Sequence, residues 1–147
     1  MTAKEYLSQA FHLDHRIDSK IDQLESLNSL ARKCTATLSG MPHSPNHGAS
    51  TMAEVVAKIV DLQAEINADI DALVDLKREM VAVIKAIPND EYQTVLEKRY
   101  LCFQKWEEIA VSMHFSIQYA NRVHERALKE LEKTEIFMKQ AMKVDGS

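Results

Sequence analysis

The chain has 147 residues, of which 46% are hydrophobic and 27% charged, and its formal net charge is −4 at pH 7. This composition is ordinary for a folded globular protein and excludes a low-complexity or disordered chain. No apolar run approaches the roughly 20 residues of a membrane-spanning helix, and the N-terminus lacks the apolar core of a secretory signal, so we expect a cytoplasmic protein without a membrane partner.

An all-α fold is expected, because only three Gly and three Pro occur and β-branched clusters in two-residue alternation are absent. Residues 1–87 are predicted to form a long antiparallel helical hairpin. Thr2 and Glu5 make a capping-box pattern at the start of a helix over about 3–38. Residues 39–50 hold two prolines and two glycines and are predicted to be a loop. Thr51 and Glu54 repeat the capping box before a second helix over 51–87.

The second helix carries an apolar heptad from Met52 to Ile87, which only Asp69 interrupts. We interpret Asp69 as a partly solvated residue at the edge of the seam, with a role in fixing helix register as the alternative. Ile70 and Ile84 widen the stripe, so the helix is expected to contact more than one neighbour. Two long helices bury little core, which favours a homo-oligomer, with a dimer preferred, or packing against the C-terminal part.

Residues 88–147 are predicted to form a separate C-terminal helical unit. Pro88 ends the hairpin, and Asn89 is a suitable N-cap for a helix over about 90–101. After a short break, a helix over 106–113 is expected. Ser116 can then cap a last helix from Ile117 to about Lys139.

The stretch from Trp106 to Val123 has the apolar spacing of a helix-turn-helix, the motif that places its second helix in the DNA major groove. A small residue, Ala110, stands where the two helices would cross. The residues expected to pack inside the motif are Ile109, Met113, Phe115, Ala120 and Val123.

The outward residues at the start of the second helix are of types that contact base edges, because Gln and Asn pair with adenine and Arg with guanine or phosphate. They are Ile117, Gln118, Asn121, Arg122 and Glu125. A basic stripe continues along the same helix and is predicted to contact phosphates: Arg122, Arg126, Lys129 and Lys133. The alternative is a solvated face whose cations pair with Glu125, Glu130 and Glu132.

Charge is divided unevenly along the chain. Residues 98–143 hold nine Lys and Arg against six Asp and Glu, whereas residues 1–87 hold nine against twelve. Because the local excess of +3 is modest, we expect weak intrinsic affinity for DNA. A dimer, or docking on another DNA-bound protein, would compensate.

Residues 90–133 resemble region 4 of sigma-70-type transcription factors in the segments "VLEKRY", "EIA" and "RALKEL" and in a Ser before the last helix. The resemblance implies that Ser116, Ile117, Gln118, Asn121 and Arg122 face double-stranded DNA. Two positions depart from the family pattern, since His114 replaces the usual turn glycine and Lys105 the usual Ser or Thr cap.

The whole chain is similar to a family of small proteins of unknown function from phages and prophages of Gram-positive bacteria, on the segments "MTAKEYLSQA", "KIVDLQAEINADIDALVDLKREM" and "LEKRYLCFQKWEEIA". It resembles the ArpU-type phage late-gene regulators more loosely. This similarity implies a regulator acting in a bacterial host cell.

No enzyme, metal site or cofactor is predicted. The histidine pairs His12 with His15 and His43 with His47 each lack the three or four converging ligands that a metal needs, and we interpret them as surface residues. Cys34 and Cys102 are expected to be reduced, buried thiols. Trp106 is expected to pack against the 90–101 helix, and His124 to approach a phosphate or lie on the surface.

Two other functions remain open beside a DNA-binding transcription regulator. One is an adaptor that binds RNA polymerase or a sigma-interacting protein without touching DNA, which the acidic balance favours. The other is a small terminase-like subunit for phage DNA packaging, in which a helix-turn-helix joins an oligomerising hairpin.

Overall fold

The computed structural model describes the backbone of residues 1–40 and 45–145 and the side chains of residues 1–36 and 50–143. All regular structure in these ranges is helical, so the chain has the predicted all-α fold. The elements are α1 (Ala3–Gly40), α2 (Pro45–Lys85), α3 (Asp90–Leu96), the π-helical segment η1 (Glu97–Leu101), α4 (Trp106–Met113), α5 (Ile117–Lys133) and α6 (Glu135–Asp145). None of the described helices is long and apolar enough to cross a membrane.

The predicted loop at 39–50 is wrong over most of its length. Helix α1 continues to Gly40 and α2 already begins at Pro45, so Thr51 lies inside a helix and cannot be its N-cap. Proline is well suited to the first turn of a helix, because the backbone N–H that it lacks would have no partner there. Residues 41–44, with His43, lie outside the described residues, and so does the side chain of His47.

Contacts divide the chain into two compact units. The first unit comprises Met1–Leu13 with Leu73–Ser147, and the second comprises Asp14–Ala72. The first unit therefore contains the start of α1, the end of α2 and all later helices.

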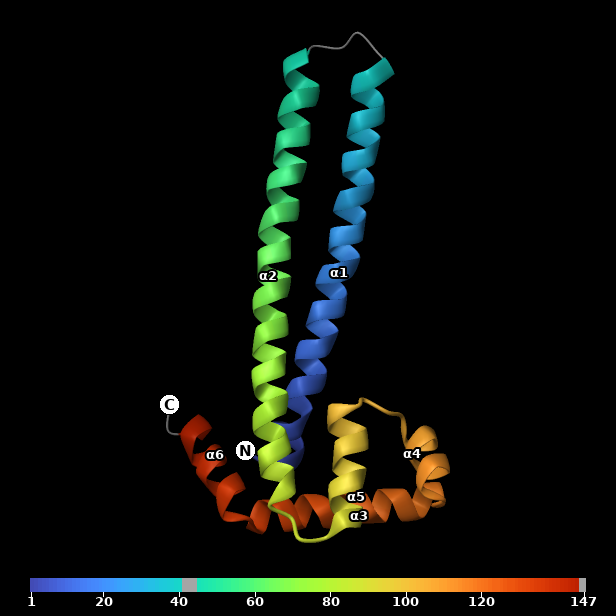
Figure 1. The fold of residues 1–147 in the computed structure, drawn as a ribbon, viewed down its shortest axis with the longest axis vertical. Helices are drawn as coiled ribbons and strands as arrows, with labels where there is room; N and C mark the ends of the chain where they lie inside the picture. The colour runs from blue at the N-terminus through green and yellow to red at the C-terminus, as the bar shows by residue number, and fades with distance from the viewer. Residues whose placement is uncertain (41–44, 146–147) are drawn as a thin grey trace. The chain divides into compact units, whose positions relative to one another are not determined.

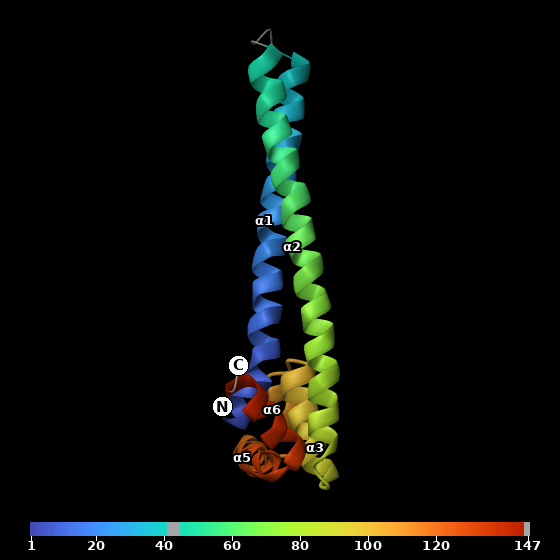
Figure 2. The same ribbon diagram turned by 90° about the vertical axis from the view of Figure 1, so that its left-hand side faces the viewer.

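The first unit is built around one apolar core. Its N-terminus is fixed by the predicted capping box, since the backbone N–H of Glu5 donates to Thr2 Oγ1 (3.1 Å) and that of Thr2 to Glu5 Oε2 (3.3 Å). The core draws on α1, α2, α3, η1, α5 and α6. Its fully buried members include Tyr6, Leu7, Met80, Val83, Ile84, Ile87, Leu96, Ala127 and Leu131. Within this unit α5 packs on both α3 and α4, as Figure 1 shows. Figure 2 views α5 end on.

The second unit consists of the α1 and α2 segments that run antiparallel and side by side in Figure 1 and Figure 2. The Lys20 Nζ and Asp69 Oδ2 atoms form an ion pair of 2.6 Å across the two helices. About four-fifths of both side chains is shielded from solvent, so Asp69 is better described as a half-buried paired carboxylate than as a solvated edge residue.

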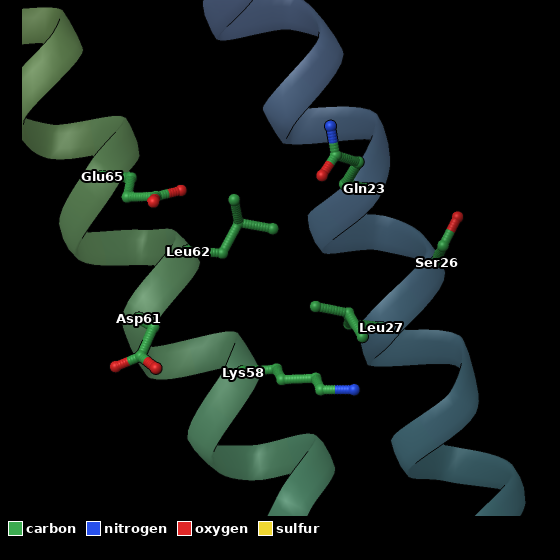
Figure 3. A pocket seen from close by; sticks show the side chains of 7 residues that line it. All are labelled: Gln23, Ser26, Leu27, Lys58, Asp61, Leu62 and Glu65. Atoms are coloured by element: carbon green, nitrogen blue, oxygen red, sulfur yellow. The ribbon is translucent and has the colours of Figure 1, made fainter.

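A hollow of about 500 Å³ opens beside the same pair of helices. Figure 3 shows Leu27 and Leu62 pointing toward each other across the gap, with polar side chains around them.

Helix α5 ends earlier than predicted. The predicted continuous helix to about Lys139 is interrupted at Thr134, which has extended backbone angles (φ −73°, ψ 143°) and separates α5 from α6. The Thr134 hydroxyl donates to the Leu131 carbonyl (2.7 Å) and accepts from the Phe137 N–H (3.4 Å). The break directs Phe137 into the core, where its ring meets Tyr6 edge-on at 6.0 Å.

The two cysteines are free thiols in the structure. Cys34 is half-buried and Cys102 is exposed, so the predicted burial of Cys102 is wrong. The π-helical segment explains this position. The Cys102 N–H bonds the Glu97 carbonyl five residues back (3.0 Å), which ends the helix with the Cys102 side chain toward solvent.

Candidate nucleic-acid interface

The turn between α4 and α5 is closed by two backbone hydrogen bonds. The Phe115 N–H donates to the Ala110 carbonyl (2.9 Å), and the His114 N–H to the Val111 carbonyl (3.3 Å), which is the bonding pattern of a Schellman motif. His114 takes the left-handed conformation at φ 60° and ψ 39°. The turn therefore has the expected geometry, with a histidine in a place that favours glycine.

The start of α5 is capped as predicted. Ser116 has extended backbone angles, and its hydroxyl accepts from the Tyr119 N–H at 3.0 Å. By contrast, Lys105 provides no side-chain cap for α4, as its sequence suggested. A rigid, capped start fixes the direction in which the first turn of α5 presents its side chains.

Small and apolar residues pack where α4 and α5 meet. Ile109 and Ala110 of α4 are buried, and so are Ala120 and Val123 of α5. Alanine at both positions lets the two backbones approach closely. Met113 and Phe115, which were also predicted to pack inside the motif, are half-buried.

All eight residues predicted to contact DNA lie on α5 or at its cap, and all are exposed. They are Ser116, Ile117, Gln118, Asn121, Arg122, Arg126, Lys129 and Lys133. The opposite side of α5 is buried through Ala120, Val123, His124, Ala127, Leu128 and Leu131. Helix α5 therefore has one face in the core and one face available to a partner.

At about 100° per residue, Gln118, Arg122, Arg126, Lys129 and Lys133 occupy an arc of about 80°. Asn121 lies about 60° outside that arc, next to the buried Leu128. The structure therefore groups Gln118 with the basic stripe and leaves Asn121 at the edge of the exposed face.

Few of the carboxylates near the basic stripe of α5 form ion pairs with it. Lys133 Nζ lies 3.6 Å from Glu130 Oε1, one of the pairs that the solvated-face alternative anticipates. Glu132 is used elsewhere, since its Oε1 accepts from the Ala3 N–H at 3.0 Å and so satisfies a free donor at the start of α1. Among the described residues, no ion pair involves Arg122 or Lys129.

A contact that the sequence pattern did not indicate joins the start of α5 to α3. The Tyr119 hydroxyl donates to Glu91 Oε1 at 3.2 Å, and this carboxylate raises the pKa of the Tyr119 phenol. Glu91 thereby places a negative charge close to the first turn of α5. Glu91 could be recognised as the partner of Tyr119 only once the packing of α3 against α5 was known.

His124 is buried, so both of its predicted roles are wrong. It is 6% exposed, and its Nε2 lies 2.7 Å from the Tyr100 hydroxyl. Burial lowers the pKa of His124 to about 4 and raises that of Tyr100 to about 12, so both are neutral at pH 7. A neutral imidazole inside the motif is a structural element and offers no charge to a phosphate.

Beside His124, a hollow of about 270 Å³ is lined by residues of α1, η1, α4 and α5. The Arg99 guanidinium at this hollow donates to the Gln104 carbonyl (3.0 Å) and lies 5.1 Å from the centre of the Trp106 ring. Trp106 also packs edge-on against His124 at 4.6 Å. These contacts engage Arg99 within the fold and tie α4 to η1 and α5.

Among the residues that the structure describes, no three His, Cys, Asp or Glu side chains come together as ligands for a metal ion. Comparisons of the chain with protein-family models, with curated proteins and with solved structures found no match.

Proposed function

We propose that the chain is a DNA-binding transcription regulator, encoded by a phage or prophage, that reads double-stranded DNA with α5. The observation that carries this proposal is the exposure of Gln118, Asn121 and Arg122 on the first two turns of α5, directly after a tight, capped turn. Amide and guanidinium side chains recognise base edges in the major groove, and a recognition helix enters the groove with its N-terminal end.

The charge distribution along α5 supports the same orientation. Arg122 and Lys133 are separated by about 16 Å along the helix axis, so the stripe between them can lie along a DNA backbone. Unpaired N–H groups at the start of a helix also favour a phosphate. Since the local charge excess is only +3, one copy is expected to bind weakly, and the proposal includes self-association as a homodimer.

Selection from a random duplex library, followed by mobility-shift titration of the enriched sequence, tests the proposal. The double variant Asn121→Ala with Arg122→Ala is expected to lower affinity tenfold or more, at about 1–3 kcal/mol for each lost base contact. The matched control replaces the exposed pair Asp75 and Arg78 of α2 by Ala and should bind like the wild type. Equal affinity of the wild type and the α5 double variant would refute these contacts.

A second candidate is an adaptor that binds RNA polymerase or a sigma-interacting protein through the same motif. The observation that favours it is the exposure of two apolar side chains, Val111 on α4 (76%) and Ile117 on α5 (46%), together with the carboxylates Glu107 and Glu108 in the first turn of α4. Apolar and acidic groups suit a protein surface better than a phosphate backbone.

The two candidates differ in their response to salt and to one substitution. An adaptor should bind purified bacterial RNA polymerase, lose that binding in Val111→Asp, and show no salt-sensitive DNA binding. A DNA-reading regulator should keep its DNA affinity in Val111→Asp, because Val111 lies on α4 rather than on α5.

A further inference from the structure

The second unit exposes more large apolar side chains than it buries. Within the part of Asp14–Ala72 whose side chains are described, four apolar residues are buried: Ile17, Val55, Leu62 and Ile66. Five large ones are exposed: Ile21, Leu30, Val56, Val60 and Ile70. A pair of helices with so small a core needs a further partner to cover its apolar surface.

Most of the exposed apolar residues fall on one stripe of α2. The stripe repeats at alternating steps of four and three residues, which is the spacing of a coiled-coil seam. Its members are Val56, Val60, Gln63, Asn67, Ile70 and Val74. The four aliphatic members are 45%, 58%, 40% and 50% exposed in chain order.

This seam, residues 56 to 74 of α2, is symmetric about residue 65. Reading outward from that midpoint, Gln63 corresponds to Asn67, Val60 to Ile70, and Val56 to Val74. Each pair joins residues of the same chemical kind. In an antiparallel pair of identical helices with its two-fold axis at residue 65, residue i lies beside residue 130 − i, so this symmetry brings like residues together. A parallel pair gains nothing from it.

We propose that a second copy of this chain covers the seam, with the two α2 helices antiparallel and the two-fold axis at residue 65. The aliphatic pairs then pack at both ends, and Gln63 of one copy meets Asn67 of the other at the centre. This dimer rests on the self-association included in the proposed function. Its tests contain no DNA, so the dimer and the DNA binding can fail independently.

The residues that border the seam are compatible with this contact. Ala57 and Ala64 lie on its outer flank, and small side chains there let two helices approach closely. The single acid on that flank, Asp71, lies at the level of Ile59 of the second copy, so it does not meet a like charge there. The next seam position is Lys77, whose ammonium lies over the Phe103 ring at 4.5 Å and so ends the apolar stripe.

The amide pair at the centre gives the contact its specificity. Gln and Asn side chains each carry a donor and an acceptor, so one pair can satisfy both across the axis. A buried polar pair also penalises registers in which an amide would meet an aliphatic group. The antiparallel register is thus set by Gln63 and Asn67.

Light scattering of the full chain without DNA tests whether the seam joins two copies. The wild type should have twice the 16.7 kDa mass of one chain, and Val60→Asp should shift it to one. Val60 is exposed in the single chain, so the substitution should leave the circular dichroism spectrum unchanged. Val111→Asp is the matched control, because Val111 is exposed away from the seam. A wild-type monomer, a ring-sized oligomer, or a dimer that survives Val60→Asp would overturn the proposal.

Cross-linking tests the direction of the helices. In a background with Cys34→Ser and Cys102→Ser, a Val60→Cys chain mixed with an Ile70→Cys chain should form a disulfide between the two under mild oxidation. Each variant alone should form little. Cross-linking of Val60→Cys with itself, and none in the mixture, would show parallel helices and overturn the antiparallel pairing.

Discussion

His114 holds the turn of the candidate interface in a conformation that costs a residue with a Cβ atom about 1 kcal/mol or more. The two Schellman bonds around it and the capped start of α5 hold the turn in this conformation. The strain is therefore confined to one residue.

We predict that His114→Gly stabilises the protein by up to about 1 kcal/mol, because glycine adopts positive φ without a steric penalty. Val111→Gly, in the exposed middle of α4, is the matched control and should destabilise by a similar amount. Urea unfolding followed by circular dichroism measures both. A loss of stability in His114→Gly would show that the imidazole makes a contact that outweighs the strain.

His124 makes the free energy of unfolding depend on pH, and its lowered pKa gives the direction of that dependence. Because its pKa falls from 6.5 in the unfolded chain to about 4 in the folded one, the unfolded chain binds the proton more tightly. The contribution of neutral His124 to the free energy of unfolding is complete above about pH 6.5. It is lost as the pH falls toward 4, with a limiting slope of about 1.4 kcal/mol per pH unit. Lys4 and Arg99 add to the shift, and Glu125 opposes it.

We therefore expect the free energy of unfolding of the wild type to fall between pH 6.5 and 4.5 more steeply than that of His124→Gln. The glutamine retains a polar group for Tyr100 and has no proton to gain. Denaturant unfolding at several pH values provides the comparison. Parallel curves for the two proteins would contradict the assignment of this slope to His124.

At the scale of helices and turns, side-chain caps decide where the elements begin and end. The capping box at Thr2 and the N-caps Asn89 and Ser116 were predictable, because each satisfies free N–H groups with its own side chain. Thr51 fits the same pattern but lies inside α2. The helix begins at Pro45 instead, because the residues before Thr51 also adopt helical geometry. Thr134 was missed because apolar spacing carries on across it.

We predict that Thr134→Ala destabilises the protein by about 1 kcal/mol, because it removes the hydroxyl that bonds Leu131 and Phe137 at the break between α5 and α6. Thr134→Ser should retain most of the stability. Thr35→Ala is the control, since Thr35 bonds Ala31 four residues back within a helix, where alanine is the better helix former. Thermal unfolding of the three variants measures the effect, and an unchanged midpoint for Thr134→Ala would argue against a capped break.

The π-helical segment η1 could not be predicted from periodicity. Its backbone bonds run from Cys102 to Glu97 and from Gln104 to Lys98, and Leu96 and Tyr100 beside them are both buried in the core. Phe103 follows with a positive φ of 56° and meets the Phe11 ring of α1 at 6.0 Å. Contacts between residues far apart in sequence therefore overrode the local helical pattern.

For the whole chain, composition and apolar spacing were sufficient to predict an all-α fold. Helical spacing separated the inward and outward faces of α5 except at His124, which was predicted at the surface and is buried. What they could not provide were the partners of individual polar side chains. Asp69 meets Lys20, Glu132 meets the start of α1, Tyr119 meets Glu91 and His124 meets Tyr100. Each pair joins different helices, so packing had to be known first.

We propose that α5 reads DNA through base contacts at its start and phosphate contacts along its basic stripe. The most direct test is the salt dependence of the binding constant for a selected duplex, measured for the wild type, Lys129→Gln and Asn121→Ala. We predict that Lys129→Gln lowers the slope of log K against log salt by about 1, whereas Asn121→Ala keeps the slope and loses preference for the selected sequence. Identical slopes and identical sequence preference in all three proteins would contradict the account.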